Sequence, residues 1–105
     1  MSNLSIGKHD IIVPGGKLRF SIEAYKGFPE KIYIHGIEVK EPYRGLGIGT
    51  RLLNEIIDLS NKSNLPIELF AEPIRDSSMT KDELIDWYKS KGFEEVGGSL
   101  MVYVP

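Results

Sequence analysis

The fold is decided by one stretch, Val39-Lys40-Glu41-Pro42-Tyr43-Arg44-Gly45-Leu46-Gly47-Ile48-Gly49-Thr50-Arg51-Leu52-Leu53. It begins at the end of an apolar run typical of a strand, passes three glycines at alternate positions and continues with helical periodicity. A glycine turn that opens a helix presents unpaired backbone N–H groups, and the helix start carries partial positive charge. Glycine suits such a turn because a Cβ would obstruct an approaching anion. The stretch therefore predicts a site for a phosphate-bearing ligand.

The size and composition indicate a single small domain over residues 1–105. Hydrophobic residues make up 41% and charged residues 27%, which is ordinary for a globular protein. The net charge of -2 gives no electrostatic reason to expect nucleic acid or an anionic membrane as a partner. The chain has no cysteine and only two histidines, His9 and His35, so the sequence predicts no disulfide, no thiol nucleophile and no metal site.

The sequence carries no signal for export or membrane insertion. The N-terminal residues Met1-Ser2-Asn3-Leu4-Ser5-Ile6 lack the basic and apolar regions of a signal peptide. No apolar run is long enough to span a membrane. We therefore expect a soluble, cytoplasmic protein.

The first third of the chain is rich in strand signals. An apolar run at Ile11-Ile12-Val13 is stopped by the turn signal Pro14-Gly15-Gly16. Residues 18–24 then alternate between apolar and polar types, and residues 31–39 form a second strand-like run. We expect these two runs to pair as a hairpin.

The run at residues 31–39 has an interrupted face pattern. Simple alternation places Ile32 and Ile34 on one face, and it places the following residues on the other face: Tyr33, His35, Ile37 and Val39. Gly36 and Glu38 break the apolar face that begins with Ile32 and Ile34. A β-bulge near them would change which side chains face which way.

After the glycine turn, the pattern predicts a helix from about Gly47 to Ser60. Its apolar positions form a stripe at helical spacing: Ile48, Leu52, Leu53, Ile56, Ile57 and Leu59. A further strand is expected at residues 66–71. A strand, a helix and a strand in succession predict a right-handed crossover to a parallel neighbour.

The last third predicts a second helix and a closing hairpin. Thr80 and Glu83 have the spacing of a capping box, and Gly92 follows the last helical turn at Lys91. The runs 93–96 and 99–104 are expected to pair around Gly97-Gly98. The fold class is therefore α+β or α/β, with a single mixed, mostly antiparallel sheet and two main helices.

The glycine turn differs from two well-known phosphate loops. A Walker-type loop needs Gly-Lys followed by Ser or Thr, and Gly49-Thr50-Arg51 has no such lysine. A dinucleotide-binding fingerprint needs glycines spaced G-x-G-x-x-G, whereas Gly45, Gly47 and Gly49 are spaced G-x-G-x-G. Three close glycines also suit a plain tight turn, so the surrounding sequence has to decide.

The sequence around the three glycines resembles that of the GNAT superfamily of N-acetyltransferases. Their signature of Arg or Gln, two residues, Gly, one residue, and Gly or Ala is met here as Arg44-Gly45-Leu46-Gly47-Ile48-Gly49. Residues 39–43 resemble the usual lead-in to this signature from the central strand. Trp87-Tyr88-Lys89-Ser90-Lys91-Gly92-Phe93 resembles the helix-to-strand element of the family, often Leu-Tyr-x-x-x-Gly-Phe. The resemblance covers roughly residues 31–96 and implies a GNAT-like fold.

The resemblance also implies acetyl-CoA as the donor of an acetyl group. In this family the loop holds the pyrophosphate, a role that falls here on Arg44, Gly45, Leu46, Gly47, Ile48, Gly49 and Thr50. Backbone groups of Ile37 and Val39 would line the thioester end, and one N–H would polarise its carbonyl. The implied reaction is direct transfer of the acetyl group to a primary amine in a ternary complex, without a metal.

Three side chains are candidates for moving protons in this reaction. Tyr88 matches the tyrosine with which many family members protonate the departing thiolate, although it also fits a core position between Ile85 and Trp87. His35 lies on the central strand, and imidazole is a side-chain type suited to general base catalysis, but a hydrogen-bonded sheet histidine is the alternative. Glu38 is the rival base if a bulge turns it inward, and otherwise it is a solvated carboxylate.

The N-terminal part departs from the family pattern. The usual domain opens with a strand and two helices that wall off the acceptor site, whereas about thirty residues here read as strands and turns. The acceptor pocket is then open, built from other loops, or completed by the second subunit of a homodimer. Lys81 also stands where the family frequently carries an asparagine.

Two functions remain open at this stage. The first is an acetyl-CoA-dependent N-acetyltransferase acting on a protein, a peptide or a small amine. The second is a catalytically weak or inactive acetyl-CoA-binding module that regulates a partner protein. The missing helices favour the second function, while Tyr88 and the intact loop favour the first. The sequence does not identify the acceptor amine.

Overall fold

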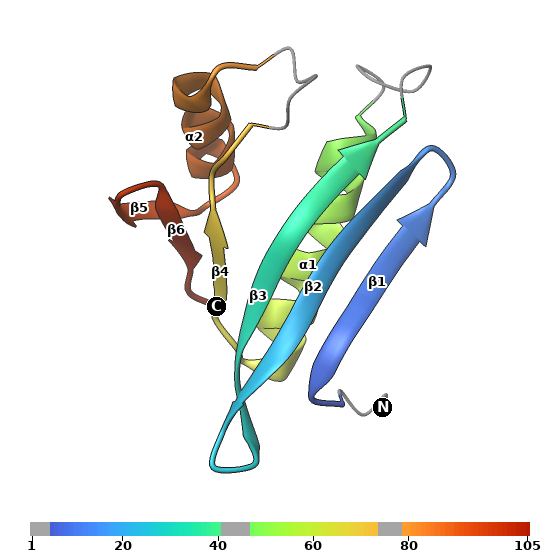
Figure 1. The fold of residues 1–105 in the computed structure, drawn as a ribbon, viewed down its shortest axis with the longest axis vertical. Helices are drawn as coiled ribbons and strands as arrows, with labels where there is room; N and C mark the ends of the chain where they lie inside the picture. Colours follow the sequence, from blue (N-terminus) through green and yellow to red (C-terminus); the bar gives the residue numbers. More distant parts are fainter. Residues whose placement is uncertain (1–4, 41–46, 74–78) are drawn as a thin grey trace.

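The computed structural model describes residues 5–40, 47–73 and 79–105. The described segments form one six-stranded sheet with the strand order β1-β2-β3-β4-β6-β5, and two helices (Figure 1). The elements in chain order are β1 (Gly7–Val13), β2 (Gly16–Tyr25), β3 (Phe28–Val39), α1 (Ile48–Ser63), β4 (Ile67–Phe70), α2 (Lys81–Ser90), β5 (Glu94–Gly97) and β6 (Leu100–Tyr103).

The sheet is mixed, as the sequence predicts. β1, β2 and β3 form an antiparallel meander, and β4, β6 and β5 form antiparallel pairs at the other end. α1 connects β3 to β4, which pair in parallel. The expected fold class and the expected parallel crossover are therefore confirmed.

A β-bulge in β3 corrects the simple alternation of its faces. Ile34 pairs with Phe20 and Gly36 pairs with Arg19, so His35 is an extra residue without a partner in this register. Beyond the bulge, Ile37 pairs with the buried Leu18. Ile37 therefore shares the core face with Ile32 and Ile34 rather than facing the other way. The assignment of His35, Ile37 and Val39 to one face was wrong, because one inserted residue reverses the alternation.

Helix α1 packs its apolar stripe against the N-terminal half of the sheet. Leu52, Leu53 and Ile56 are fully buried, and burial of such a side chain contributes roughly 1.5–3 kcal/mol. The helix extends past the predicted end at Ser60 to Ser63, where Asn64 adopts a left-handed conformation with φ 59°. The stripe seen in the sequence thus joins α1 to β1, β2 and β3.

Helix α2 begins and ends as the sequence predicts. The Thr80 side chain accepts from the Glu83 N–H, and the Glu83 carboxylate accepts from the Thr80 N–H. At the other end, Gly92 adopts φ 100°. The closing hairpin differs in detail, because Gly97 pairs with Leu100 and the turn falls at residues 98–99.

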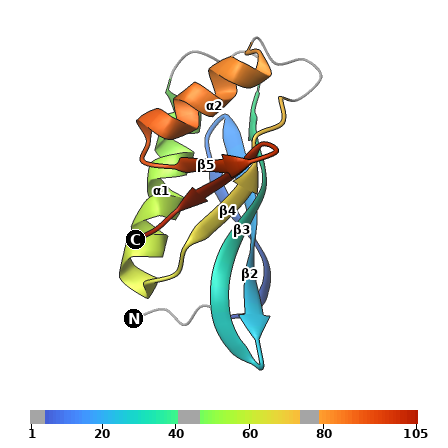
Figure 2. The same cartoon turned by 90° about the vertical axis from the view of Figure 1, so that its left-hand side faces the viewer.

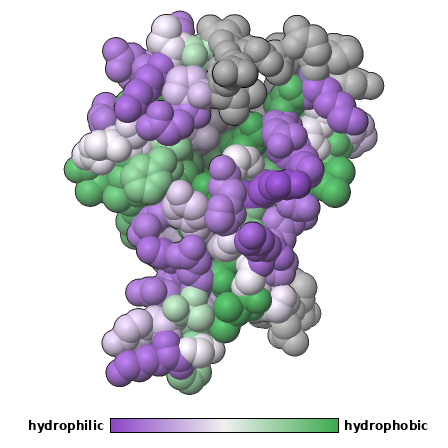
Figure 3. Space-filling view, viewed as in Figure 1, coloured by the Kyte–Doolittle hydropathy of each residue, from purple (hydrophilic) through white to green (hydrophobic). Residues whose placement is uncertain are grey.

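Both helices lie on the same face of the sheet (Figure 2). The other face carries no helix in the described part of the chain (Figure 1). Its surface mixes charged and apolar residues (Figure 3). Neither α1 nor α2 is long and apolar enough to cross a membrane.

Candidate active site

A cleft opens where β3 and β4 separate. The two strands pair only at Ile32 with Ile67 and at Tyr33 with Glu68, although β3 continues to Val39. Beyond this point a cavity of about 600 Å³ lies between them, closed at the sides by the start of α1 and by α2. Residues from both faces of the sheet line it, so the cleft passes between the strands from one face to the other.

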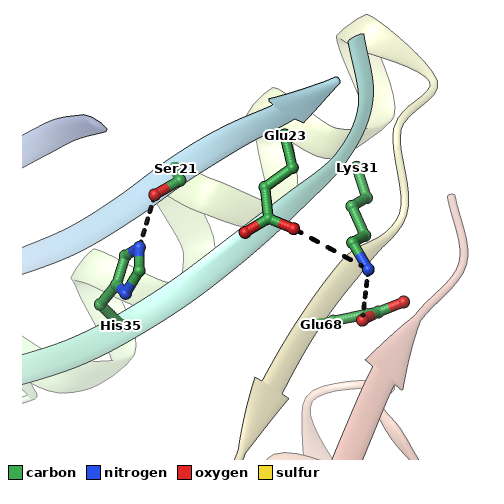
Figure 4. A network of polar contacts seen from close by, with 5 residues as sticks. All are labelled: Ser21, Glu23, Lys31, His35 and Glu68. Carbon is green, nitrogen blue, oxygen red and sulfur yellow. Dashed lines mark hydrogen bonds and ion pairs between the residues drawn. The ribbon is translucent and has the colours of Figure 1, made fainter. Parts of the chain in front are cut away.

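Three charged side chains lie close together near the positions where β3 and β4 pair. Lys31 Nζ donates to Glu68 Oε1 at 3.1 Å and lies 3.9 Å from Glu23 Oε1, which ties β3 to both neighbouring strands (Figure 4). The hydrogen bond to Glu68, followed by the charges of Glu68 and Glu23, raises the pKa of Lys31. Lys31 is therefore a structural cation rather than a base.

The start of α1, from Gly47 to Thr50, lines the cleft. Gly47 is the N-cap residue with φ 78°, a conformation that favours glycine, and no side chain of the described residues caps this end. The first turn of α1 holds no acidic residue. Gly47 and Thr50 also border an outer depression of about 410 Å³, which Arg51 lines next to Thr50 and which Glu55 and Asp58 line further along α1. The helix end therefore offers N–H groups and a nearby cation to an anion.

The bulge directs the backbone of β3 toward the cleft. The Ile32 N–H donates toward β4, to Pro66 O at 2.8 Å, whereas the Lys40 N–H donates to Gly15 O at 2.8 Å on the β2 side. In a regular strand these two even-numbered residues would point the same way. Because of the inserted residue, the odd-numbered Ile37 and Val39 direct their backbone groups toward β4. This is the orientation that a ligand lying along β3 requires.

Tyr88 lies at the cleft with its side chain buried among aromatic rings. The residue is 7% exposed, and its ring lies 5.0 Å from that of Trp87 and 5.5 Å from that of Phe93, between centroids. Burial raises the pKa of the Tyr88 hydroxyl to about 12, and it is the sole cause of the shift. The hydroxyl is thus protonated at neutral pH and able to donate a proton or a hydrogen bond.

His35 reaches the cleft from the bulge, on the face without helices. Its Nε2 lies 2.5 Å from Ser21 Oγ, and the ring meets Tyr33 edge-on with centroids 4.9 Å apart (Figure 4). Ser21 is 8% exposed, whereas His35 is exposed. The serine therefore anchors one nitrogen of the imidazole and leaves Nδ1 for other contacts.

Glu38 takes a different place from His35. It pairs with Lys17 of β2, it is exposed, and it is not among the residues that line the cleft. Its side chain lies on the helix-free face with that of Lys17, because Ile37 next to it faces the core. Three further predicted residues, Arg44, Gly45 and Leu46, lie outside the described residues.

Three residues of the site were not singled out from the sequence. Trp87 forms a wall of the cleft, and a Cβ added to Gly49 would lie 3.8 Å from its ring. Phe70 is 51% exposed and lies edge-on to Tyr33, with centroids 6.4 Å apart. Ser21 holds His35. An apolar residue at the solvent-facing position of a strand was the available signal for Phe70.

No group of three or more histidine, aspartate or glutamate side chains in the described segments is placed to hold a metal ion. The site consists instead of a helix start, a strand backbone, a buried hydroxyl and an imidazole. These groups can bind an anion, polarise a carbonyl group and move protons.

A family model described as the acetyltransferase (GNAT) family matches residues 14–93. The chain therefore belongs to the GNAT family of acetyltransferases. The match includes β2 to α2 and so contains every element that lines the cleft.

Two curated proteins are similar over part of their length. The chain is 32% identical over 69 residues to the uncharacterized protein ML0378 of Mycobacterium leprae (strain TN), covering 66% of this chain and 17% of that protein. It is 29% identical over 65 residues to N-alpha-acetyltransferase 50 of Danio rerio, covering 62% of this chain and 36% of that protein. The chain thus spans well under two thirds of either relative.

Solved structures with the same fold include a protein of matching length. The anti-CRISPR protein AcrVA5 superposes with a TM-score of 0.77 at 32% identity, covering 93% of this chain and 99% of that chain. Naa50 of Arabidopsis thaliana, solved with the bisubstrate analogue CoA-Ac-MVNAL, gives 0.64 at 25% identity, covering 86% and 65%. The acetyltransferase YhbS of Escherichia coli, solved with CoA, gives 0.59 at 20% identity, covering 85% and 51%, and supports the fold alone.

Proposed function

We propose that this protein is an acetyl-CoA-dependent N-acetyltransferase that transfers the acetyl group directly to a primary amine. One observation carries the proposal: the start of α1, which has no capping side chain among the described residues, and the buried Tyr88 line the same cleft. The first feature suits a pyrophosphate, and the second suits a departing thiolate. The Arabidopsis Naa50 structure, with its CoA-linked peptide, supports this ligand.

The donor would enter from the helix side of the sheet. The N–H groups of Ile48, Gly49 and Thr50 would bind its pyrophosphate, together with the loop residues Arg44, Gly45 and Leu46 predicted from the sequence. Arg51 adds a positive charge beside the same helix turn. The backbone of β3 would hold the extended arm, with the N–H of Ile37 or Val39 donating to the thioester oxygen as negative charge develops there.

The acceptor amine would approach from the helix-free face. His35 and the aromatic rings of Tyr33 and Phe70 line the cleft on that side. The amine nitrogen forms a bond to the carbonyl carbon, the carbon–sulfur bond breaks, and the amide is released. His35 would take the proton that the amine loses, while Tyr88 would supply the proton that the thiolate gains.

His35 is the preferred base over Glu38 because it lines the cleft and Glu38 does not. As a base, the imidazole needs a lone pair on Nδ1. It therefore has to donate from Nε2–H to Ser21 Oγ, at the 2.5 Å contact between them. Glu38 remains a candidate for attracting a cationic acceptor across the exposed sheet surface.

The acceptor itself is proposed to be a protein. The match to the anti-CRISPR protein AcrVA5 covers almost the whole of both chains, whereas other relatives match in part. This likeness favours a second candidate function, inhibition of a CRISPR system by acetylating one of its proteins. The helix-free, open side of the cleft suits the side chain of a large partner.

A thermal-shift titration with acetyl-CoA, with NAD as the control ligand, tests the donor site. We expect acetyl-CoA alone to raise the melting temperature, and a lack of stabilisation would reject the proposal. Release of CoA in the presence of a peptide array and a polyamine panel then tests transfer. A protein that binds acetyl-CoA and acetylates no amine, yet blocks CRISPR interference in cells, would favour the regulatory binding module instead.

A further inference from the structure

The outer edge of β1 has no pairing strand in the described segments of the chain. β1 stands at one end of the strand order, and β2 is its pairing partner among the described residues (Figure 1). A strand edge presents a row of N–H and C=O groups that pair readily with another strand. β1 runs over seven residues, Gly7–Val13, which is long enough for a ladder.

The backbone groups of three residues point away from the sheet. Val13 pairs with Gly16 across a two-residue turn, and the residues that flank such a turn exchange hydrogen bonds with each other. The direction alternates along the strand, so the odd-numbered residues of β1 face β2. The N–H and C=O groups of Lys8, Asp10 and Ile12 therefore face outward.

The side chains of the same residues are exposed on the helix-free face. Lys8, Asp10 and Ile12 alternate with partly buried residues, and Ile12 is 73% exposed. Ile6, just before the strand, is 50% exposed. Along this face the order is therefore apolar, positive, negative, apolar. When a second copy of the strand runs in the opposite direction, each apolar residue meets an apolar residue and each charged residue meets a residue of opposite charge.

We propose that two copies of this chain form a homodimer by antiparallel pairing of β1 with the partner's β1, around a two-fold axis at His9. In this register Lys8 lies opposite the partner's Asp10, and Asp10 lies opposite the partner's Lys8. Ile12 meets the chain around the partner's Ile6. The outward backbone groups of all these residues then find partners, and the two sheets become one continuous sheet.

Charge selects this register over its neighbours. An axis at Lys8 would place two lysines opposite each other, and an axis at Asp10 would place two aspartates opposite each other. Like charges directly opposite destabilise a strand pair, whereas opposite charges contribute roughly 0.2–1 kcal/mol. Asp10 also lies 3.9 Å from Arg19 of its own chain, so the dimer continues a row of alternating charges.

The dimer leaves both clefts accessible. β2 and β3 separate β1 from the cleft between β3 and β4, so the partner's β1 does not reach the acceptor side. In this dimer the second copy therefore lies away from the acceptor pocket. The proposal is independent of the reaction that the cleft performs.

Charge reversal with exchange of partners tests the register. We expect the wild-type chain to sediment at twice its 11.8 kDa mass, and the variants Lys8→Asp and Asp10→Lys to be monomers when each is pure. An equimolar mixture of the two variants restores both opposite-charge pairs and should form a heterodimer. Asp58→Lys, on the exposed side of α1, is the matched control and should remain a dimer.

Amide hydrogen exchange tests the edge itself. In the dimer the amides of Lys8, Asp10 and Ile12 should be protected, and Asp10→Pro, which removes an outward N–H, should return the others to fast exchange. The amides of His9 and Ile11, which face β2, should stay protected in both the wild type and the Asp10→Pro variant. A wild-type monomer at high protein concentration, or a dimer insensitive to Lys8→Asp, would overturn the proposal. The proposal would also be overturned if the Lys8 amide became protected from exchange only when a strand of another protein was added.

Discussion

The substitution Tyr88→Phe removes one oxygen atom from the buried aromatic cluster and tests the role of the hydroxyl. The phenylalanine ring keeps the contacts with Trp87 and Phe93, whose centroids lie 5.0 and 5.5 Å away. General acid catalysis contributes typically 10²–10⁴-fold in rate. We therefore expect kcat to fall about 100-fold or more, while the KM for acetyl-CoA changes little.

Stability separates this role from a purely structural one. Burial is the sole cause of the raised pKa of Tyr88, so the hydroxyl loses hydration on folding without a compensating charge. Loss of such a group costs little or stabilises the protein. We expect the melting temperature of the variant to stay level or to rise. A large fall in both kcat and melting temperature would point to damage of the fold, and an unchanged kcat would refute the acid role.

The pH dependence of stability gives an independent check. The pKa of Tyr88 rises from 10.0 to about 12 on folding. Below pH 10 the hydroxyl is protonated in both states; as the pH rises toward 12, the unfolded state loses its proton first and the folded state becomes less stable. A shift of about 2 pKa units corresponds to roughly 3 kcal/mol. Urea unfolding between pH 10 and 12 should show this loss in the wild type and not in Tyr88→Phe.

The high pKa does not prevent proton transfer to a thiolate. Burial disfavours every anion in the cleft, so it raises the pKa of a thiol formed there as well as that of Tyr88. The pKa difference between Tyr88 and a thiol in the cleft is therefore smaller than the pKa difference between Tyr88 in the protein and a thiol in water. A solvent isotope effect on kcat that disappears in Tyr88→Phe would support transfer from this hydroxyl.

Three further substitutions test other parts of the molecule. Gly47→Ala places a side chain at φ 78°, so we expect a loss of about 1 kcal/mol in unfolding free energy and weaker acetyl-CoA binding by calorimetry; unchanged affinity would argue against a ligand at this helix start. Gly16→Ala puts a Cβ 2.6 Å from Ile48 Cγ2 and 3.0 Å from a backbone oxygen, and overpacking of this kind typically costs 1–3 kcal/mol in denaturant unfolding. Thr80→Ala removes half of the capping box and should cost roughly 1 kcal/mol, with serine at this position restoring the stability.

The elements were predictable because their signals are local. Thr80 and Glu83 define the start of α2 through hydrogen bonds between side chain and backbone within a few residues, and the structure confirms this capping box. The spacing of Leu52, Leu53 and Ile56 defines the buried side of α1 in the same way. The parallel crossover also followed from the order of the elements, because chain connectivity leaves few alternatives.

The site was predictable only in part, because its geometry depends on long-range register. The inserted residue in β3 becomes visible only in the pairing with β2, and it decides that Ile37 shares the core face with Ile34. The contact between Ser21 and His35 joins residues on different strands. Neither residue carries a local signal for the other.

The sequence by itself determined the class of fold, the glycine turn at the start of α1 and the tyrosine of α2, because each depends on residues that are near neighbours in the chain. The tertiary structure decided where these parts meet. β3 and β4 separate after two paired positions, and this separation turns a helix start, a strand backbone and Tyr88 into one cleft. The tertiary structure also decided that β1 lies at the edge of the sheet formed by the described residues, because the strand order of a sheet is set by packing across the whole chain rather than by any one stretch.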